Sequence, residues 1–296
     1  MYEYTAFQDW FDQQTGLTGP EDELLSSFTA ARKLKQDSTA MTLEEIQAQI
    51  TAGDHGEVRI PAGVHKMEPR ANGDSNLYIS SRKRLKLCGP GALQFPDSEG
   101  GIIVTAPNGV PSEDCLIEGV GIFGGKNGIT VRASHRITIR DCVIYGKGHA
   151  DGVGILVEKN SHDVHLYNTS IESREYGISL QTPDSVIRDG VVRRCRVGVY
   201  WNGPATQISG VHVFPDIGTE TEIGMQIGPW ASHLAFADQC YFDNCQLAFL
   251  SATGGAWEDG DGPVFTNTYM NSQRHAAAKF VEGELLELRN TMVEKA

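Results

Sequence analysis

The chain has 296 residues, a hydrophobic content of 40%, a net charge of −13 and a pI of about 5.1. This acidic balance excludes a basic nucleic-acid-binding protein and disfavours binding to an anionic membrane surface. The sequence has no secretory signal and no apolar run long enough to cross a bilayer, so we expect synthesis in the cytoplasm and no membrane insertion.

Residues 1–56 have a pattern of their own and are predicted to form an N-terminal helical cap. Apolar residues recur at helical spacing in three stretches: Phe7, Trp10 and Phe11; Leu24, Phe28, Ala31 and Leu34; Leu43, Ile46 and Ile50. Thr42 and Glu45 form a capping box that predicts the start of the last of these helices. A cap would cover the open first coil of a repeat protein, and the alternative is a segment that docks into a larger assembly.

Residues 57–67, EVRIPAGVHKM, and 77–91, LYISSRKRLKLCGPG, come next and are predicted to form two less regular coils. Their PAG and CGPG sequences are typical of tight turns between short strands.

From Gly101 onward the chain repeats one cycle of three strands. Cycles open on a glycine followed by apolar residues at 101, 128, 154, 177, 198 and 224, and two weaker copies start at 248 and 276. The starts are 21 to 28 residues apart, which is the period of a solenoid coil.

A corner follows the second strand of each cycle. The predicted corners are Gly119, Asp141, Asn168, Asp189, Gly210, Asp238, Asn267 and Asn290. Hydrophobic residues stand two positions before them (Ile117, Ile139, Leu166, Ile187, Ile208, Phe236, Phe265, Leu288) and three after (Ile122, Ile144, Ile171, Val192, Val213, Tyr241, Met270, Val293). Asx and Gly tolerate the left-handed backbone of a tight corner, and we expect the stacked Asx side chains to form a ladder.

The sequence therefore predicts an all-β fold, a single-stranded right-handed parallel β-helix with three strands per coil over residues 57–296. A doubly wound α/β domain is the alternative, but it needs a helix between parallel strands and no connection has helical periodicity. The six cysteines lack zinc-site spacing and are expected to be buried thiols; a disulfide is the alternative. We expect no cofactor.

The order of these features resembles a known superfamily. A helix, VRIPAGVHKM, an apolar strand, LKLCGPG and Asx-cornered coils are similar to the pectate-lyase-like right-handed β-helices, and within them to phage tailspikes and to capsule or O-antigen depolymerases. The resemblance covers about residues 40–296. It implies a polysaccharide partner, a homotrimer, contact with virion tail proteins, and a location in the virion tail or outside the cell. The catalytic motifs of the superfamily are absent, apart from a partial match at GHADG. We therefore assign no catalytic residue of this sequence from the resemblance.

Alternation along the first strands places two rows of side chains on the outer face. One row is Thr105, Arg132, Glu158, Gln181 and Asn202, and the other is Ile103, Thr130, Leu156, Ser179, Tyr200 and Gln226. Such a polar strip suits a sugar chain lying along the axis, although any solvated sheet face has a similar composition. The candidate substrate-binding residues are Arg132, Gln181, Tyr200, Asn202, Gln226, Trp230 and Trp257. Trp201 falls on an inward position and is expected in the core.

Three long loops, residues 146–154, 215–224 and 253–262, are predicted beside these strands. Glycosidic cleavage usually needs two carboxyl groups, and the candidates are Glu158, Asp151, Glu220 and Glu222. Acids at 258–261 are a second possibility, and surface acids without a catalytic role are the simpler interpretation of each. No metal site is predicted. The alternatives to a depolymerase are a non-catalytic structural or receptor-binding virion protein and a free carbohydrate lyase or epimerase.

Overall fold

The computed structural model describes residues 40–295 apart from 54, 97–99, 147–151, 216–220, 232–234, 246, 252–263, 273–277, 280–286 and 290–291. The predicted first two helical stretches and the candidates Asp151, Glu220 and Trp257 lie outside these residues, as does the corner Asn290.

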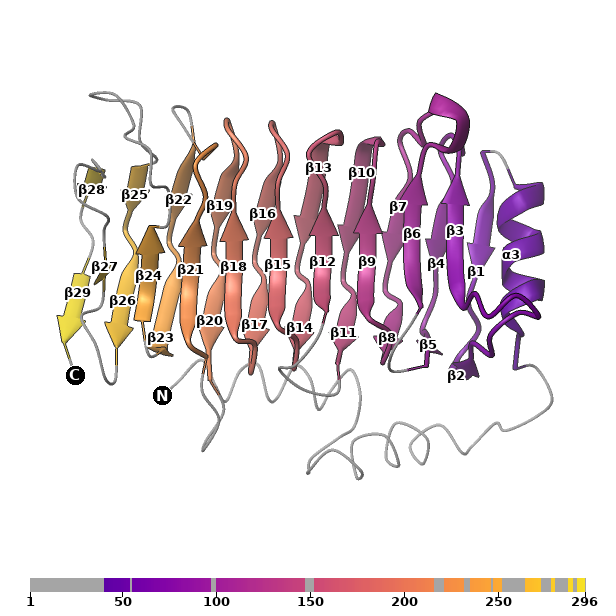
Figure 1. Ribbon diagram of the computed structural model, residues 1–296, viewed down its shortest axis with the longest axis horizontal. Helices are drawn as coiled ribbons and strands as arrows, with labels where there is room; N and C mark the ends of the chain where they lie inside the picture. The colour runs from indigo at the N-terminus through magenta and orange to yellow at the C-terminus, as the bar shows by residue number, and fades with distance from the viewer. Residues whose placement is uncertain are drawn as a thin grey trace.

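Helix α3 (Leu43–Ala52) lies at one end of the solenoid and covers its first coil (Figure 1). The capping box is present: the Thr42 hydroxyl accepts from the Glu45 N–H, and the Glu45 carboxylate accepts from the Thr42 N–H. Leu43, Ile46 and Ile50 are buried in the same core as the strands, which confirms the helix as an N-terminal cap.

The side chain of Gln47 forms hydrogen bonds with backbone groups at the exposed edge of the first coil. Its side-chain amide donates to the carbonyl of Tyr78 at 2.9 Å, and its Oε1 accepts from the Tyr78 N–H at 2.8 Å. The amide therefore takes the place of a neighbouring strand, and the helix protects an edge that would otherwise be open to pairing with another chain.

The described strands form three parallel sheets that run side by side along the long axis (Figure 1). The first-strand sheet contains β3 (Asn76–Ser80), β6 (Gly101–Thr105), β9 (Asn127–Val131), β12 (Val153–Val157), β15 (Tyr176–Leu180), β18 (Val197–Trp201), β21 (Ile223–Ile227), β24 (Leu247–Ser251) and β27 (Ala278–Lys279). The second-strand sheet contains β1 (Glu57–Arg59), β4 (Lys86–Cys88), β7 (Leu116–Glu118), β10 (His135–Arg140), β13 (His162–Tyr167), β16 (Val186–Arg188), β19 (Gln207–Ser209), β22 (Phe236–Asp238), β25 (Val264–Thr266) and β28 (Glu287–Arg289). The third-strand sheet contains β2 (Gly63–Lys66), β5 (Gly91–Gln94), β8 (Gly121–Phe123), β11 (Val143–Tyr145), β14 (Ser170–Glu172), β17 (Val191–Arg193), β20 (His212–Phe214), β23 (Tyr241–Cys245), β26 (Tyr269–Ser272) and β29 (Met292–Lys295).

Each strand pairs with its counterpart in the next coil, so the predicted right-handed parallel β-helix with three strands per coil is confirmed. The two irregular first coils are also confirmed, because β1 to β5 lie where the sequence places them. A short 3₁₀ helix (Pro107–Gly109) follows β6.

The predicted corners adopt the left-handed backbone in the central coils. Asp141, Asn168 and Asp189 have φ of 55°, 47° and 54°. Asn168 Nδ2 donates to Asp141 Oδ1 at 2.8 Å, which is one rung of the expected ladder. On either side of these corners the predicted inward residues, such as Ile139 and Ile144, are fully buried.

The prediction is wrong by one residue in the coil of Asp238. Gln239 has the left-handed backbone there, with φ of 52°. Ala237 and Phe242 therefore fill the inward positions assigned to Phe236 and Tyr241, and Phe236 is 36% exposed. The reason is that Asp238 is the last residue of β22, where its Oδ1 accepts from Thr266 Oγ1 at 2.6 Å and from Asn267 Nδ2 at 2.8 Å. An Asx residue can thus bind the neighbouring corner without forming the corner itself.

Close packing explains the glycine near the start of each first strand. A Cβ on Gly154 would lie 2.5 Å from the carbonyl oxygen of Gly177 and 2.4 Å from Cγ2 of Ile171. Equivalent contacts recur at Gly177, where the next coil approaches as closely. A larger residue would push adjacent coils apart.

All six cysteines are buried as free thiols. Burial raises the pKa of Cys142, Cys195 and Cys240 to about 12, which favours the unreactive thiol. Trp201 is fully buried against Phe265, as its inward position predicted.

Candidate functional site

The outer face of the first-strand sheet carries the predicted row in register. Strand pairing aligns Tyr78, Ile103, Thr130, Leu156, Ser179, Tyr200 and Gln226. Adjacent members are about 4.8 Å apart because that is the spacing between strands. The row thus follows the long axis of the molecule, and Thr130 and Ser179 are covered between larger neighbours.

Arg132 and Glu158 meet on this face from adjacent coils. Arg132 Nε donates to Glu158 Oε2 at 2.9 Å, and Nη2 donates to Oε1 at 2.8 Å. This bidentate contact raises the pKa of Arg132. Two candidates that the sequence assigned to different roles are therefore partners, and both oxygens of the Glu158 carboxylate accept hydrogen bonds from Arg132.

Arg196 lies between two carboxylates at the start of the neighbouring coils. It donates to Glu175 at 2.8 Å and to Glu222 at 3.4 Å, and its guanidinium lies 5.5 Å from the centre of the Tyr176 ring. The hydrogen bond that Arg196 donates to the Glu175 carboxylate is the main cause that raises the pKa of Arg196. The sequence-based search found Glu222 but missed Glu175 and Arg196. The missed signal was positional, since all three stand two residues before the glycine that opens a cycle.

Three substrate-binding candidates, Tyr200, Asn202 and Trp230, gather at the ends of β18 and β21. Asn202 Oδ1 accepts from the backbone N–H of Trp230 at 2.9 Å, and the Asn202 side chain is buried. A Cβ on Gly228 would lie 2.4 Å from Asn202 Oδ1 and 2.7 Å from Tyr200 Oη, so these polar atoms converge over Gly228. Burial raises the pKa of Tyr200.

Trp230 offers an exposed aromatic surface at this edge of the sheet. It is 48% exposed, and the Lys159 ammonium lies 3.4 Å from its ring centre. A ring held by a cation on one side keeps a fixed orientation, which suits stacking on a sugar ring. Gln181 donates to Ser179 at 3.1 Å and remains half-buried, as does Gln226 beside Tyr200.

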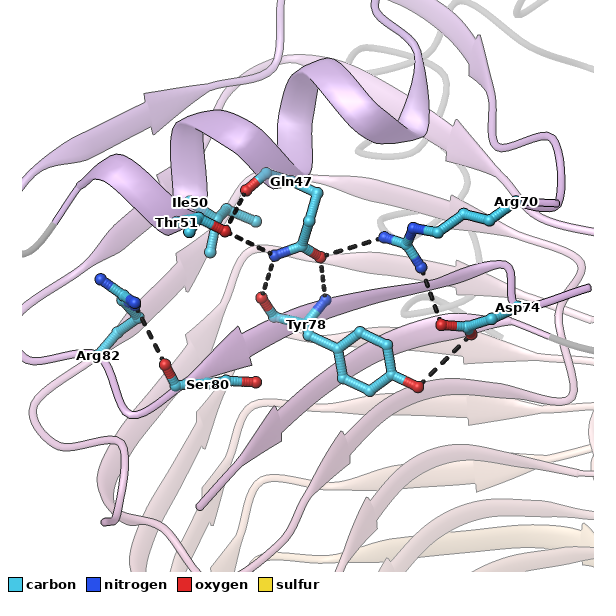
Figure 2. A pocket seen from close by; sticks show the side chains of 8 residues that line it. All are labelled: Gln47, Ile50, Thr51, Arg70, Asp74, Tyr78, Ser80 and Arg82. Atoms are coloured by element: carbon cyan, nitrogen blue, oxygen red, sulfur yellow. Dashed lines mark hydrogen bonds and ion pairs between the residues drawn. The ribbon is translucent and has the colours of Figure 1, made fainter. Parts of the chain in front are cut away.

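A cavity of about 400 Å³ opens between α3 and β3 (Figure 2). Its lining residues are Gln47, Ile50, Thr51, Arg70, Asp74, Tyr78, Ser80 and Arg82. Arg70 donates to Asp74 at 2.9 Å and crosses toward Gln47 above the cavity, while the Tyr78 ring forms one wall. Sequence reasoning missed this cavity because it exists only once the helix packs on the first coil.

A second cavity of about 210 Å³ lies on the same sheet, one coil further along. Asn76, Lys126, Asn127 and Thr130 contribute its polar side chains. Both cavities thus adjoin the row that begins at Tyr78. The cavities and the row lie on the same face of the solenoid.

Among the residues that the structure describes, no cluster of three or more His, Cys, Asp or Glu side chains has the geometry of a metal site. The same part of the chain holds no helix long and apolar enough to span a membrane.

Comparisons with known proteins agree with the β-helix fold. A family model described as "Right handed beta helix region" matches residues 95–214. No curated protein matches the chain.

Three solved structures illustrate the likeness. The A-module of the mannuronan C-5 epimerase AlgE4 from Azotobacter vinelandii is 13% identical, with a TM-score of 0.62 over 84% of this chain and 72% of that one. The endo-xylogalacturonan hydrolase from Aspergillus tubingensis is 9% identical, with a TM-score of 0.55 over 88% of this chain and 91% of that one. The tailspike protein of E. coli bacteriophage HK620, in complex with a pentasaccharide, is 13% identical, with a TM-score of 0.54 over 94% of this chain and 60% of that one. The chain has the right-handed parallel β-helix fold that the resemblance to the pectate-lyase-like superfamily implies.

Proposed function

We propose that this chain binds a polysaccharide along the outer face of its first-strand sheet and cleaves it there. The observation that carries the proposal is the in-register row from Tyr78 to Gln226, which is bordered by two cavities and by the exposed ring of Trp230. A straight row at strand spacing, in which polar side chains such as Tyr78, Tyr200 and Gln226 stand with the apolar Ile103 and Leu156, matches a linear polymer better than a compact ligand.

The three similar folds support a carbohydrate ligand, because their names describe an epimerase of mannuronan, a hydrolase of xylogalacturonan and a tailspike bound to a pentasaccharide. The finer proposal, which rests on the resemblance of the sequence to phage tailspikes, is a phage depolymerase that acts as a homotrimer on the virion. Sedimentation at micromolar concentration tests the trimer, and a monomer would contradict it.

The chemistry that this face offers is based on carboxylates held by guanidinium groups. Glu158 on Arg132 and Glu222 on Arg196 can act as ionised groups that activate water or stabilise positive charge on the sugar. A proton donor must then come from elsewhere, and Asp151 and Glu220 remain the candidates from the sequence. Arg196 could also bind a carboxylate of an acidic sugar.

Mass spectrometry of the products released from a panel of capsular and O-antigen polysaccharides tests cleavage. Saturated oligosaccharides would support hydrolysis, and products with an unsaturated terminal sugar would support β-elimination. If the protein binds a polysaccharide but releases no product from it, the proposal of cleavage is contradicted and the proposal of binding stands.

A non-catalytic receptor-binding protein is the second candidate, and one observation favours it. Both catalytic candidates that the structure describes, Glu158 and Glu222, contact arginines. Paired charges of this kind also occur on surfaces without a catalytic role. Binding without product in the panel would select this alternative.

A further inference from the structure

The row of the first-strand sheet ends beside helix α3. Tyr78 lies on β3, the first strand of that sheet, and the side chain of Gln47 occupies the edge of β3 where another strand would pair. Gln47 Nε2 also donates to Thr51 Oγ1, one turn further along the helix, at 3.4 Å. No described strand continues the row past Tyr78, so the cavity between α3 and β3 stands at the end of the row.

The guanidinium group of Arg70 is fixed on one side of this cavity. Its Nη1 donates to Asp74 Oδ2 and to the carbonyl of Asn76, both at 2.9 Å, and its Nη2 donates to Gln47 Oε1 at 3.4 Å. Figure 2 shows that the side chain reaches toward the helix from the segment before β3. Contacts with two separate elements hold the group in place, so a ligand meets a guanidinium that is already oriented.

One edge of this guanidinium keeps unused donors. Among the residues that the structure describes, none accepts a hydrogen bond from Arg70 Nε, and the one contact of Nη2 is long. The side chain is 21% exposed, so a ligand can reach it. The Nε–H and Nη2–H groups of an arginine match the two oxygens of a carboxylate. The same pair of donors binds the Glu158 carboxylate in the contact with Arg132.

The other lining residues supply contacts that suit a sugar ring. The ring of Tyr78 forms one wall, and Thr51 and Ser80 contribute hydroxyl groups. Small-molecule sites combine aromatic walls with a few polar groups in this way, and their volumes range from about 300 to 1,000 Å³. The cavity, at about 400 Å³, lies near the lower end of that range. It therefore has room for a sugar unit rather than for a long segment of a polymer.

We propose that this cavity binds a carboxylate-bearing sugar unit, a uronic acid, of a polysaccharide that lies along the row. The carboxylate lies on the Nε and Nη2 edge of Arg70, and the sugar ring lies against Tyr78. The inference rests on the proposed function, to which it adds the class of sugar and the position of one unit. Because the row ends at Tyr78, this unit is the last one that the face holds.

A cation in the neighbouring cavity also favours an acidic ligand. The cavity of about 210 Å³ is lined by Asn76 of β3, so it adjoins the same strand as the first cavity. Lys126 lines it as well, with an exposed side chain, and no described carboxylate forms an ion pair with its ammonium group. In a chain with a net charge of −13, such a cation on the face of the row attracts a negatively charged polymer.

Saturation-transfer NMR titrations of the full-length chain with monosaccharides test the proposal. The probes are D-glucuronate, D-galacturonate and D-mannuronate, and the neutral controls are D-glucose, D-galactose and D-mannose. Arg70→Gln removes the paired donors, and Thr51→Trp fills the cavity from α3, so either variant serves if the other does not fold. Gln49→Trp is the matched control, because Gln49 is exposed on the opposite side of the same helix and does not line the cavity.

We expect at least one uronate to bind about tenfold more tightly than its neutral counterpart, the scale of a hydrogen bond to a charged group. Arg70→Gln and Thr51→Trp should each weaken that binding by about tenfold or more, and Gln49→Trp should leave it unchanged. Equal binding of the neutral sugar, no binding of any uronate, or binding that both cavity variants leave intact would each overturn the proposal.

The monosaccharide probes separate this proposal from the proposed function, because they require neither a polymer nor cleavage. An oligosaccharide that binds at Trp230 while no uronate binds would contradict the cavity site alone. Uronate binding that depends on Arg70, without binding of any oligosaccharide along the row, would contradict the proposed function and leave the cavity site in place.

Discussion

At the scale of single residues, the central feature is that acids and arginines of the first-strand sheet are partners. The sequence identified Arg132, Glu158 and Glu222 from their outward positions and their chemistry, and the structure places all three on or beside one sheet. It could not identify their pairing, because alternation gives the face of a side chain but not the direction in which a long side chain extends. Glu175 and Arg196 were missed because they precede the strands, at the position two residues before the glycine that opens a cycle, and strand alternation does not reach that position.

If Glu158 takes part in cleavage, Glu158→Gln should lower turnover by orders of magnitude, because an amide cannot replace the carboxylate. Stability should change little, by about 1 kcal/mol or less, since the pair with Arg132 is on the surface. Glu118→Gln is the matched control, because Glu118 also binds an arginine but lies on the second-strand sheet. Initial rates of product release measure the effect, and equal rates in both variants would remove Glu158 from the mechanism.

His212 should make stability depend on pH. Its pKa is about 4 in the folded chain, mainly because of burial, and about 6.5 when the chain unfolds. Below the unfolded pKa the unfolded state binds the extra proton, so folding stability falls as pH drops from about 6.5 to 4, by up to about 3 kcal/mol. Urea unfolding at pH 7 and pH 4.5 measures this loss. His212→Gln should reduce the difference between the two pH values, and an unchanged difference would contradict the assignment.

At the scale of elements, corners and inward positions were predictable because both depend on local properties. Left-handed corners need Asx or Gly in most coils, and the period-2 alternation identifies which residues point inward. The failure at Asp238 shows the limit: two adjacent polar residues, Asp238 and Gln239, both fit the corner, and contacts with the next coil decide between them. The cavity beside Tyr78 could not be predicted, because it depends on how α3 packs.

The core row gives a prediction about element stability. Ile139 is fully buried between coils, so Ile139→Asp should place a charge in the core and cost about 3 to 5 kcal/mol. Arg140→Asp, one position later on the outer face, is the control and should cost far less. Thermal unfolding compares the two, and equal loss of stability would contradict the assignment of inward and outward faces.

At the scale of the whole molecule, three faces of one solenoid have different characters. The first-strand sheet carries cavities and the polar row, the second carries exposed ion pairs, and the third carries covered rings. The fold follows from a repeat that the sequence displays in every cycle, which is why it was predictable almost throughout. Function is less predictable, because the superfamily's catalytic motifs are absent and the remaining signal is the composition of one face.

The most direct test of the central claim is the affinity for a bound oligosaccharide, measured by calorimetry with the wild-type chain and two variants. Trp230→Ala removes the exposed ring beside the first-strand sheet and should weaken binding by about 1 to 3 kcal/mol, the scale of an aromatic hot spot. Tyr167→Ala, on the second-strand sheet, should leave the affinity unchanged. Loss of affinity in Tyr167→Ala with none in Trp230→Ala would place the polysaccharide on another face and contradict the account.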